Sequence, residues 1–465
     1  MGKAALGLLG LCAVVLAAWF GINATDEALS AEARAALAVL PLPAPQRDNG
    51  FLDFLVLSAP ADVPTFEAGL ERLKAINDQS RSGYAGPWES LKLDPRLRCT
   101  FGGADGGSGE ARACFELATR EPWIPAALEA HATLIKRYRA MREKARFVSL
   151  LEAKSPEHGL PAYQEMLEGD RLVLFAAARR FHAGERRDAV RELEREALFY
   201  RRMAGDASRL IDKMIAFAAL DRVALFASEL ARHAPSGDDV FWRALESTVL
   251  PLTKQELDVA PVFARELAND VQWLRTRRYV RLSDSTWKSL RWSGKTRPWW
   301  DPVAPYLYRP HQTVNWYVAR CRIFIGVGER PSTEFLEARR DARERVRALD
   351  PGPIASVLFN PAGWRHPLLD RCDDADYVGR SHGRAGVQTL VRLLVNLRAK
   401  GITKPEDVTA ALGGPLGQAH PDPFTGKPMR FDPQTGTIGF DIETKHLSAT
   451  AHAIRERYGR MALPL

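Results

Sequence analysis

One uncharged segment at the N-terminus constrains this chain more than any other feature. Residues 4–22 read AALGLLGLCAVVLAAWFGI. About twenty consecutive apolar residues are enough for a helix to span the hydrocarbon core of a bilayer. Lys3 precedes the run, and Asp26 and Glu27 follow it. Because positively charged flanks stay on the cytoplasmic side, we expect a single pass through the inner membrane, with the bulk of the chain in the periplasm.

A cleaved signal peptide is the competing interpretation of this run. Residues 22–24 would form a passable small-residue cleavage site, although the bulky Trp19 and Phe20 lie just before it. A buried N-terminal core helix is the third possibility. The length of the run favours residues 1–23 as a retained membrane anchor over a removed signal segment.

The cysteines fit a location outside the cytoplasm. Cys12 does not match a lipoprotein cysteine, because a leucine stands before it where a small residue is needed. The other four are an even number in an exported chain, which suggests disulfides. Of the three possible pairings, local loop closure favours Cys99–Cys114 and Cys321–Cys372. Four buried free thiols are the alternative, and the absence of a CxxC spacing disfavours a zinc ribbon or redox catalysis.

Helical periodicity dominates the middle of the chain. From Trp123 to about His233, apolar residues recur at spacings of three and four, which is typical of amphipathic helices. Within residues 174–197, a helix is expected to stop near Gly184, and Ala189 follows where a second helix would approach closely. This Gly-then-Ala pattern is similar to the centre of a tetratricopeptide repeat, but no period repeats three times. We predict a mainly α fold, an irregular helical-hairpin array that is TPR-like in part; an ordinary helical hairpin in a bundle is the alternative.

The C-terminal part ends in a predicted β-hairpin. Residues 429–431 and 437–441 flank Pro433-Gln434-Thr435-Gly436, which is a hairpin signal. The preceding DPFTGKPM, residues 422–429, contains Gly426-Lys427 but lacks the remaining residues of a phosphate-binding loop, so we interpret it as a turn that enters the hairpin. A last helix is expected over residues 447–461.

Three parts of the chain are therefore expected. Residues 1–23 form the membrane anchor or signal segment, and residues 24–270 form the helical body. Residues 271–465 form a loop-rich and helical C-terminal region, with the β-hairpin near residues 428–442.

Tryptophans and basic side chains alternate between residues 273 and 318, where proline and glycine interrupt the periodicity. Aromatic faces stack on sugar rings, and the cations between them bind carboxylates or phosphates. The candidate ligand-binding residues are Trp287, Arg291, Trp292, Arg297, Trp299 and Trp300. The alternative is that these rings pin a long loop onto the helical body, which is the commoner use of large aromatic side chains.

The other candidate catalytic and metal-binding patterns in the sequence are incomplete. A cluster near Cys372 matches no metal signature and is interpreted as a solvated acidic loop; it consists of His366, Asp370, Asp373, Asp374, Asp376 and His382. Ser285 and Lys288 have SxxK spacing without its partner motifs. Tyr163, Glu165 and Glu168 lie near each other on one expected helix and are candidates for a glycoside-cleaving carboxylate pair, but a solvated helix face explains them as well. We assign no catalytic residue, no metal site and no cofactor.

Several short strings resemble a group of uncharacterised proteobacterial envelope proteins. They are Arg137-Tyr138-Arg139, residues 210–215, Asn360-Pro361-Ala362-Gly363, residues 387–398 and residues 422–429. Proteins of that group have similar length, one N-terminal hydrophobic segment and a helical body. The resemblance implies placement in the envelope and no particular activity.

Composition and charge narrow the function only broadly. The chain is 46% hydrophobic and 26% charged, which is ordinary for a globular protein, and its net charge of +8 favours anionic partners weakly. We expect a membrane-anchored periplasmic binding or scaffolding protein whose partners are the inner membrane and an envelope protein or anionic glycan; nucleic acid is not expected. An envelope enzyme such as a cell-wall hydrolase is the alternative, and an immunity-type inhibitor of an exported toxin stays open.

Overall fold

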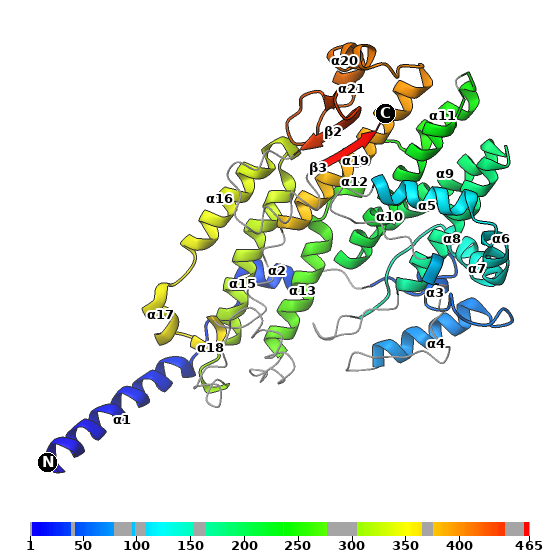
Figure 1. Ribbon diagram of the computed structural model, residues 1–465. Coiled ribbons are helices and arrows are strands. Elements are labelled where there is room, and N and C mark those ends of the chain that lie inside the picture. The colour runs from blue at the N-terminus through cyan, green and yellow to red at the C-terminus, as the bar shows by residue number, and fades with distance from the viewer. Residues whose placement is uncertain are drawn as a thin grey trace.

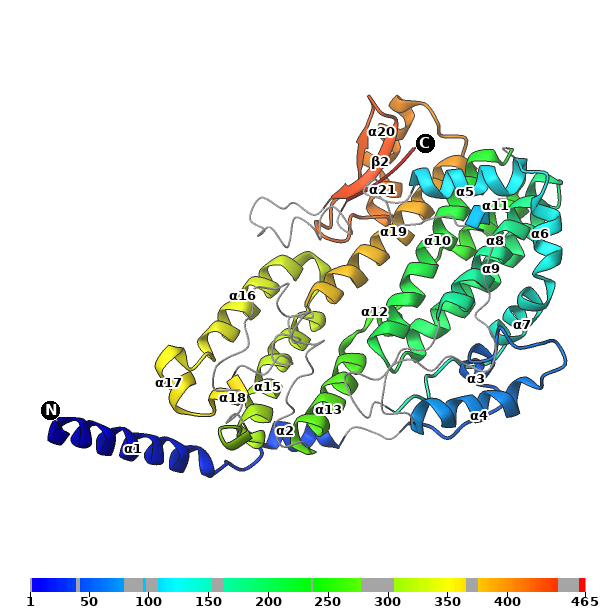
Figure 2. The same ribbon diagram turned by 60° about the horizontal axis from the view of Figure 1, so that its bottom comes forward.

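A computed structural model describes residues 2–38, 42–78, 95–97, 108–152, 163–235, 237–276, 305–364, 375–441 and 460–464. The described chain is mainly α-helical, as the sequence predicts, and ends in a small sheet (Figure 1). Helix α1 (Gly2–Ala24) projects from one corner of the molecule, and the other helices form the body (Figures 1 and 2).

The first half of the body consists of short helices around a central antiparallel set. The short elements are α2 (Ala31–Leu37), α3 (Gly50–Phe54), α4 (Thr65–Asp78), η1 (Pro95–Leu97), α5 (Ser108–Arg120), α6 (Ile124–Ala130) and α7 (Ala132–Arg142). The central set and the helices that follow it are α8 (Tyr163–His182), α9 (Arg186–Asp206), α10 (Leu210–His233), α11 (Asp239–Thr248), α12 (Lys254–Leu257) and α13 (Ala260–Thr276).

The second half adds helices on the other side of α10 and α13. They are α15 (Pro310–Ile325), η3 (Gly326–Glu329), η4 (Ser332–Glu334), α16 (Phe335–Ala348), α17 (Gly352–Leu358), α18 (Pro361–Trp364), α19 (Ala375–Ala399), α20 (Pro405–Gly413) and α21 (Pro415–Ala419). One buried hydrophobic cluster runs through both halves, from Ala33 to Leu463. The domain boundary near residue 270 stays a prediction.

The α8–α9 hairpin forms as its sequence predicts. Gly184 has φ +89°, a left-handed conformation that glycine adopts without strain, and it separates the two helices. Ala189 is fully buried in α9, so its small side chain lies at the close approach. Gly169 in α8 allows a second close approach, because an added Cβ would lie 2.7 Å from the ring of Tyr138. The likeness to a tetratricopeptide repeat stays a prediction.

The C-terminal sheet contains the predicted hairpin and a third strand. Strands β1 (Arg430–Asp432) and β2 (Thr437–Asp441) pair antiparallel, with Gly436 at φ +63° in the turn. The DPFTGKPM segment is a turn, as predicted: Asp422 accepts hydrogen bonds from the backbone N–H groups of Phe424 and Thr425.

The predicted last helix is wrong at its C-terminal end. Strand β3 (Arg460–Pro464) pairs antiparallel with β2, so Arg460 and Met461 are in a strand; residues 447–459 lie outside the described chain. Pairing satisfies the backbone groups along the second edge of β2, and it buries Leu463 against the core. A sequence pattern cannot show that this edge needs a partner.

Candidate functional site

The inner end of α1 is packed against the body. Trp19 and Phe20 contact a small buried cluster formed by Leu307, Tyr308 and Ala362. Asn23, which is 4% exposed, donates a hydrogen bond to the Leu358 carbonyl at 2.9 Å. The last turn of α1 is therefore part of the folded body.

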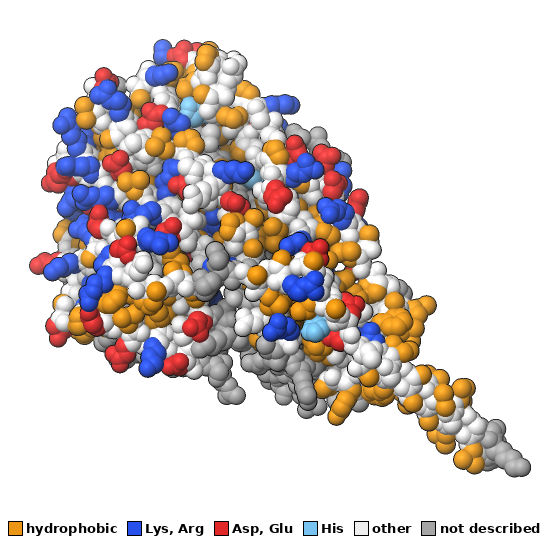
Figure 3. Space-filling model, turned by 180° about the vertical axis from the view of Figure 1, so that it is seen from behind, with side chains coloured by type: hydrophobic (Ala, Val, Ile, Leu, Met, Phe, Trp, Pro, Cys, Tyr) orange, Lys and Arg blue, Asp and Glu red, His pale blue; other side chains and the backbone are white. Residues whose placement is uncertain are grey.

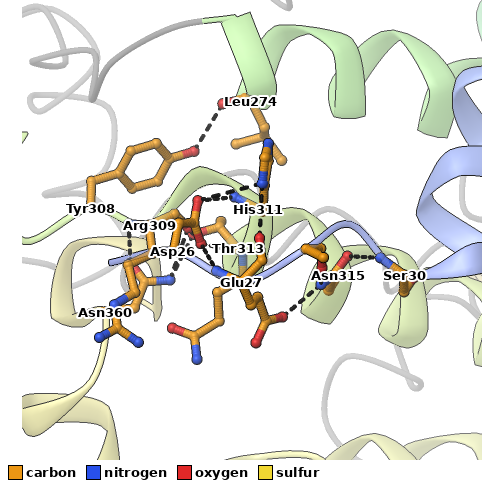
Figure 4. A network of polar contacts seen from close by, with 12 residues as sticks. Asp26, Glu27, Ser30, Leu274, Tyr308, Arg309, His311, Thr313, Asn315 and Asn360 are labelled. Carbon is orange, nitrogen blue, oxygen red and sulfur yellow. Dashed lines mark hydrogen bonds and ion pairs between the residues drawn. The ribbon is translucent and has the colours of Figure 1, made fainter. Parts of the chain in front are cut away.

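The segment after α1 follows the first turns of α15. The Asp26 carboxylate accepts hydrogen bonds from the backbone N–H groups of His311 at 2.7 Å and Gln312 at 3.1 Å. These amides have no partner within the helix, and a carboxylate there also complements the helix dipole. Asn315 donates to Glu27 and accepts from the Ser30 N–H, which continues the contact for one more turn (Figure 4).

Asn360 is the centre of this junction. Its φ is +52°, a left-handed conformation that asparagine tolerates better than most residues, and its backbone N–H donates to the side chain of Asn23 at 2.7 Å. Its side-chain oxygen accepts from the N–H groups of Arg309 and Gly363, while its amide nitrogen donates to Thr313 (Figure 4). An added Cβ on Gly363 would lie 2.2 Å from the Asn360 and Thr313 side chains, so glycine is required there.

Helix α1 is long and apolar enough to cross a membrane. An apolar window within its span of Ala5–Ala24 has a mean hydropathy of 2.3 and is exposed, whereas Asn23 at the inner end is buried. Length and composition alone do not distinguish a membrane anchor from a signal sequence. The packing of its inner end against the body is a further observation that bears on the choice between anchor and signal.

A cleft of about 430 Å³ opens on the body between α6, α7 and α8. Three basic side chains and one carboxylate stand among apolar ones; the lining residues are Leu128, Glu129, Ala132, Ile135, Lys136, Arg139, Ala176 and Arg180. Lys136 and Glu129 are exposed, Arg139 and Arg180 are half-buried, and Ile135 is buried. The cleft thus combines an apolar floor with a net positive rim.

A single carboxylate beneath the cleft positions both of its arginines. Glu192 of α9 lies 3.1 Å from Arg139 Nε and 3.6 Å from Arg180 Nη1. It also accepts a hydrogen bond from Arg142 Nη1 at 2.9 Å. Burial alone would raise the pKa of Glu192, but the guanidinium groups of Arg142 and Arg139 outweigh it and lower that pKa. The rim carries Lys136, Arg139 and Arg180 against Glu129, and with Glu192 beneath them it keeps an excess of positive charge.

The ion pairs continue as a buried layer between α7, α8, α9 and α10. Arg142 also binds Glu196, which is fully buried and accepts a hydrogen bond from Tyr138 at 2.6 Å. Burial raises the pKa of Glu196 to about 8, although Arg142 opposes the shift. On the far side of the layer, Arg222 of α10 pairs with the fully buried Asp170 at 2.7 Å.

The interpretation of Tyr163, Glu165 and Glu168 as a solvated face is wrong. All three are buried in α8, at 7%, 4% and 3% exposure. Tyr163 donates a hydrogen bond to Asp212 of α10, and burial raises the pKa of Glu165. Spacing along one helix cannot show this burial, because the residues that pack against these side chains and bond to them belong to other segments.

The tryptophan-rich candidate residues, from Trp287 to Trp300, lie outside the described residues, so their role stays a prediction. The tryptophans on either side of them are packed. Trp273 is 9% exposed, and the ring of Trp316 meets that of Trp364 edge-on at 4.6 Å while its Nε1 donates to a backbone carbonyl.

Two of the predicted disulfide cysteines lie in the described chain. Cys114 and Cys321 are buried and disulfide-bonded, and among the described cysteines Cys12 is free. Cys99 and Cys372 lie outside the described residues. The pairings Cys99–Cys114 and Cys321–Cys372 therefore stay predictions.

Most of the predicted acidic cluster, residues 366–374, also lies outside the described chain. Of its remaining members, Asp376 pairs with Arg339. His382 packs edge-on against Phe335, and burial lowers its pKa to about 4. Within the described ranges, no group of three or more His, Cys, Asp or Glu side chains is placed to hold a metal ion.

Sequence reasoning missed both the junction and the cleft. The Asn-Pro-Ala-Gly string at residues 360–363 was a usable signal, since asparagine before proline with a following glycine is typical of an irregular turn. The cleft had no such signal, because its cations come from two helices and Arg180 lies more than forty residues after Arg139 in the sequence.

Compared with known proteins, this chain matches no family model, no curated protein and no solved structure. Its function is therefore argued from geometry.

Replacing Glu196 with glutamine should change how stability depends on pH. Above pH 4.5 the unfolded chain releases this proton, whereas the folded protein keeps it up to about pH 8, so this group makes the wild type lose stability as pH rises between those values. Urea unfolding from pH 5 to pH 8 should show the stability of E196Q rising relative to the wild type. A difference that stays constant with pH would contradict the buried, protonated carboxyl.

Proposed function

We propose that this protein is a single-pass, membrane-anchored component of the cell envelope whose helical body lies in the periplasm and binds a protein partner there. The observation that carries the proposal is the packing of the last turn of α1 into the body. Asn23 bridges Leu358 and Asn360, while Trp19 and Phe20 cover an apolar cluster.

These contacts support an anchor that is retained. Cleavage after Ala24 would remove the Asn23 side chain and leave two buried backbone groups without it, at a cost of roughly 1–3 kcal/mol each if water does not replace it. Cleavage would also uncover Leu307, Tyr308 and Ala362. A signal segment that is removed does not need such a fit to the mature body.

The flanking charges support the orientation. Lys3 lies before the apolar run and Asp26 after it, which favours the N-terminus inside the cytoplasm. Disulfide-bonded Cys114 and Cys321 are consistent with an oxidising compartment for the body.

The cleft suggests the kind of ligand. Lys136, Arg139 and Arg180 offer cations beside the apolar floor of Leu128 and Ile135. An acidic peptide segment with apolar side chains fits both features. Sugar rings usually stack on aromatic side chains, and none is among the residues that line this cleft, so a glycan fits less well.

The same cleft does not support the enzyme alternative. A cell-wall hydrolase needs a pair of carboxyl groups that face the substrate. Among the described residues that line the cleft, Glu129 is the single carboxylate. Glu192 and Glu196 are both held by Arg142 beneath it. A binding role is therefore the proposal.

A reporter that is active only in the periplasm, fused after Leu465, tests the anchor and its orientation. We expect reporter activity, resistance of the protein to alkaline carbonate extraction, and an intact mass that includes residues 4–22. A fusion that begins at Glu27 is the control and should be inactive. A soluble chain that begins near residue 25, or an inactive full-length fusion, would refute the proposal.

Neutralising the cleft tests the ligand class. The double variant Lys136→Gln/Arg180→Gln should bind a labelled peptide of alternating Glu and Leu roughly tenfold more weakly, since each ion pair contributes up to about 1 kcal/mol. The control Arg347→Gln/Lys404→Gln removes the same charge from exposed positions outside the cleft and should bind normally. Equal binding by both variants, or tighter binding of an anionic oligosaccharide than of the peptide, would overturn the peptide assignment.

A further inference from the structure

Exposed apolar side chains gather where α1 leaves the body. Outside α1, the described chain exposes seven large hydrophobic side chains, and four of these belong to two segments at that point. The four are Tyr306, Ile354, Leu358 and Phe359, and they are named the collar below. Tyr306 is 70% and Ile354 is 75% exposed, which is unusual for side chains of this size in a folded protein.

The collar lies beside the inner end of α1. The Leu358 carbonyl accepts a hydrogen bond from Asn23, and Tyr306 directly precedes Leu307, which packs against Trp19 and Phe20. Both ribbon views place α17 and α18 next to the end of α1 (Figures 1 and 2). In the space-filling view, apolar side chains cover the body where the apolar helix emerges (Figure 3).

The length of α1 sets the level of the membrane surface. Its 23 residues extend about 35 Å at 1.5 Å per residue, slightly more than the ~30 Å hydrocarbon core. If the segment from Lys3 spans that core, Trp19 and Phe20 lie near the outer interface, where aromatic side chains are enriched. Leu358 of the collar contacts Asn23 in the next turn of α1, and Tyr306 adjoins Leu307 beside Trp19 and Phe20, which places the collar at about the same depth.

We propose that the collar is a membrane-interface surface: Tyr306, Ile354, Leu358 and Phe359 insert into the boundary between lipid headgroups and acyl chains around α1. This inference rests on the proposed anchor. It adds that the body contacts the bilayer through α17 as well as through α1. Two points of contact fix the tilt of the body, which a single helix leaving the membrane on a loose linker would not do.

Lipid is the occupant that the position favours. A soluble partner or a second copy of the chain would have to enter between the body and the bilayer, against the junction formed by Asn23 and Asn360. Lipid is already present there once α1 is inserted. Interfacial apolar segments bury about 5–10 Å into this boundary, which suits a short helix such as α17 better than a spanning one.

Depth-dependent fluorescence quenching tests the collar in the full-length protein reconstituted in phosphatidylcholine vesicles. A noncanonical residue carrying a dye replaces Tyr306 or Ile354, Leu11 at the middle of α1, or Ala410 on α20 as the control; all four positions are exposed. Vesicles contain lipids with a nitroxide either near the glycerol backbone or at the chain end. At 306 and 354 we expect quenching at least about twofold above that at 410, and stronger with the shallow nitroxide.

The dye at Leu11 separates this inference from the anchor. Quenching at 11 by the deep nitroxide, with values at 306 and 354 equal to the control, would overturn the collar and leave the anchor intact. Absence of quenching at 11 would overturn the anchor and, with it, the collar. Stronger quenching at 306 and 354 by the deep nitroxide would place these residues inside the hydrocarbon core and would also overturn the interface assignment.

Discussion

The contact between Asn23 and Asn360 joins three segments that are far apart in the sequence. The first is the end of α1, the second is the start of α15, and the third is the turn between α17 and α18. Asn360 can serve all three because its left-handed backbone points its N–H at Asn23 while its side chain faces Arg309 and Thr313. The side chains of Asn23 and Asn360 both find hydrogen-bond partners on other segments, so the junction forms as a unit.

The buried ionic layer positions the side chains of the cleft, not those of the junction. Arg142, Glu192 and Glu196 lie between α7 and α9 with almost no contact with water. Such groups contribute little net stability compared with apolar ones, but removing one partner leaves another buried charge without compensation. The layer therefore fixes the register of these helices, and through Glu192 it fixes Arg139 and Arg180 on the cleft. The rim is thus positioned by a buried carboxylate beneath it.

Local patterns predicted the features that local forces determine. The α8–α9 hairpin follows from Gly184 and the spacing around it, and the turn at Asp422 follows from side-chain bonds to neighbouring amides. The strands β1 and β2 were predicted to within one residue at each end. Strand β3 was not, since its partner lies about twenty residues earlier and the pattern of its own residues does not require a strand.

Sequence patterns did not predict which polar side chains are buried. Glu165, Asp170 and Glu196 look like solvated positions because a sequence shows charge and spacing but not the helices that pack across them. Several of the strings that resemble envelope proteins contain such groups, including Tyr138, Asp212 and Asn360. The envelope placement that these strings imply stays a prediction, and their physical role becomes visible only when the partners on other segments are known.

The central claim is that α1 and the body move as one piece. Spin labels at Leu11 on α1 and at Glu337 on α16, both exposed, allow their separation to be measured by pulsed dipolar spectroscopy in reconstituted membranes. The account predicts one narrow distance distribution that broadens when Asn23 is replaced by alanine. A broad distribution in the otherwise unchanged protein would show that α1 is a loose tether and would contradict the account.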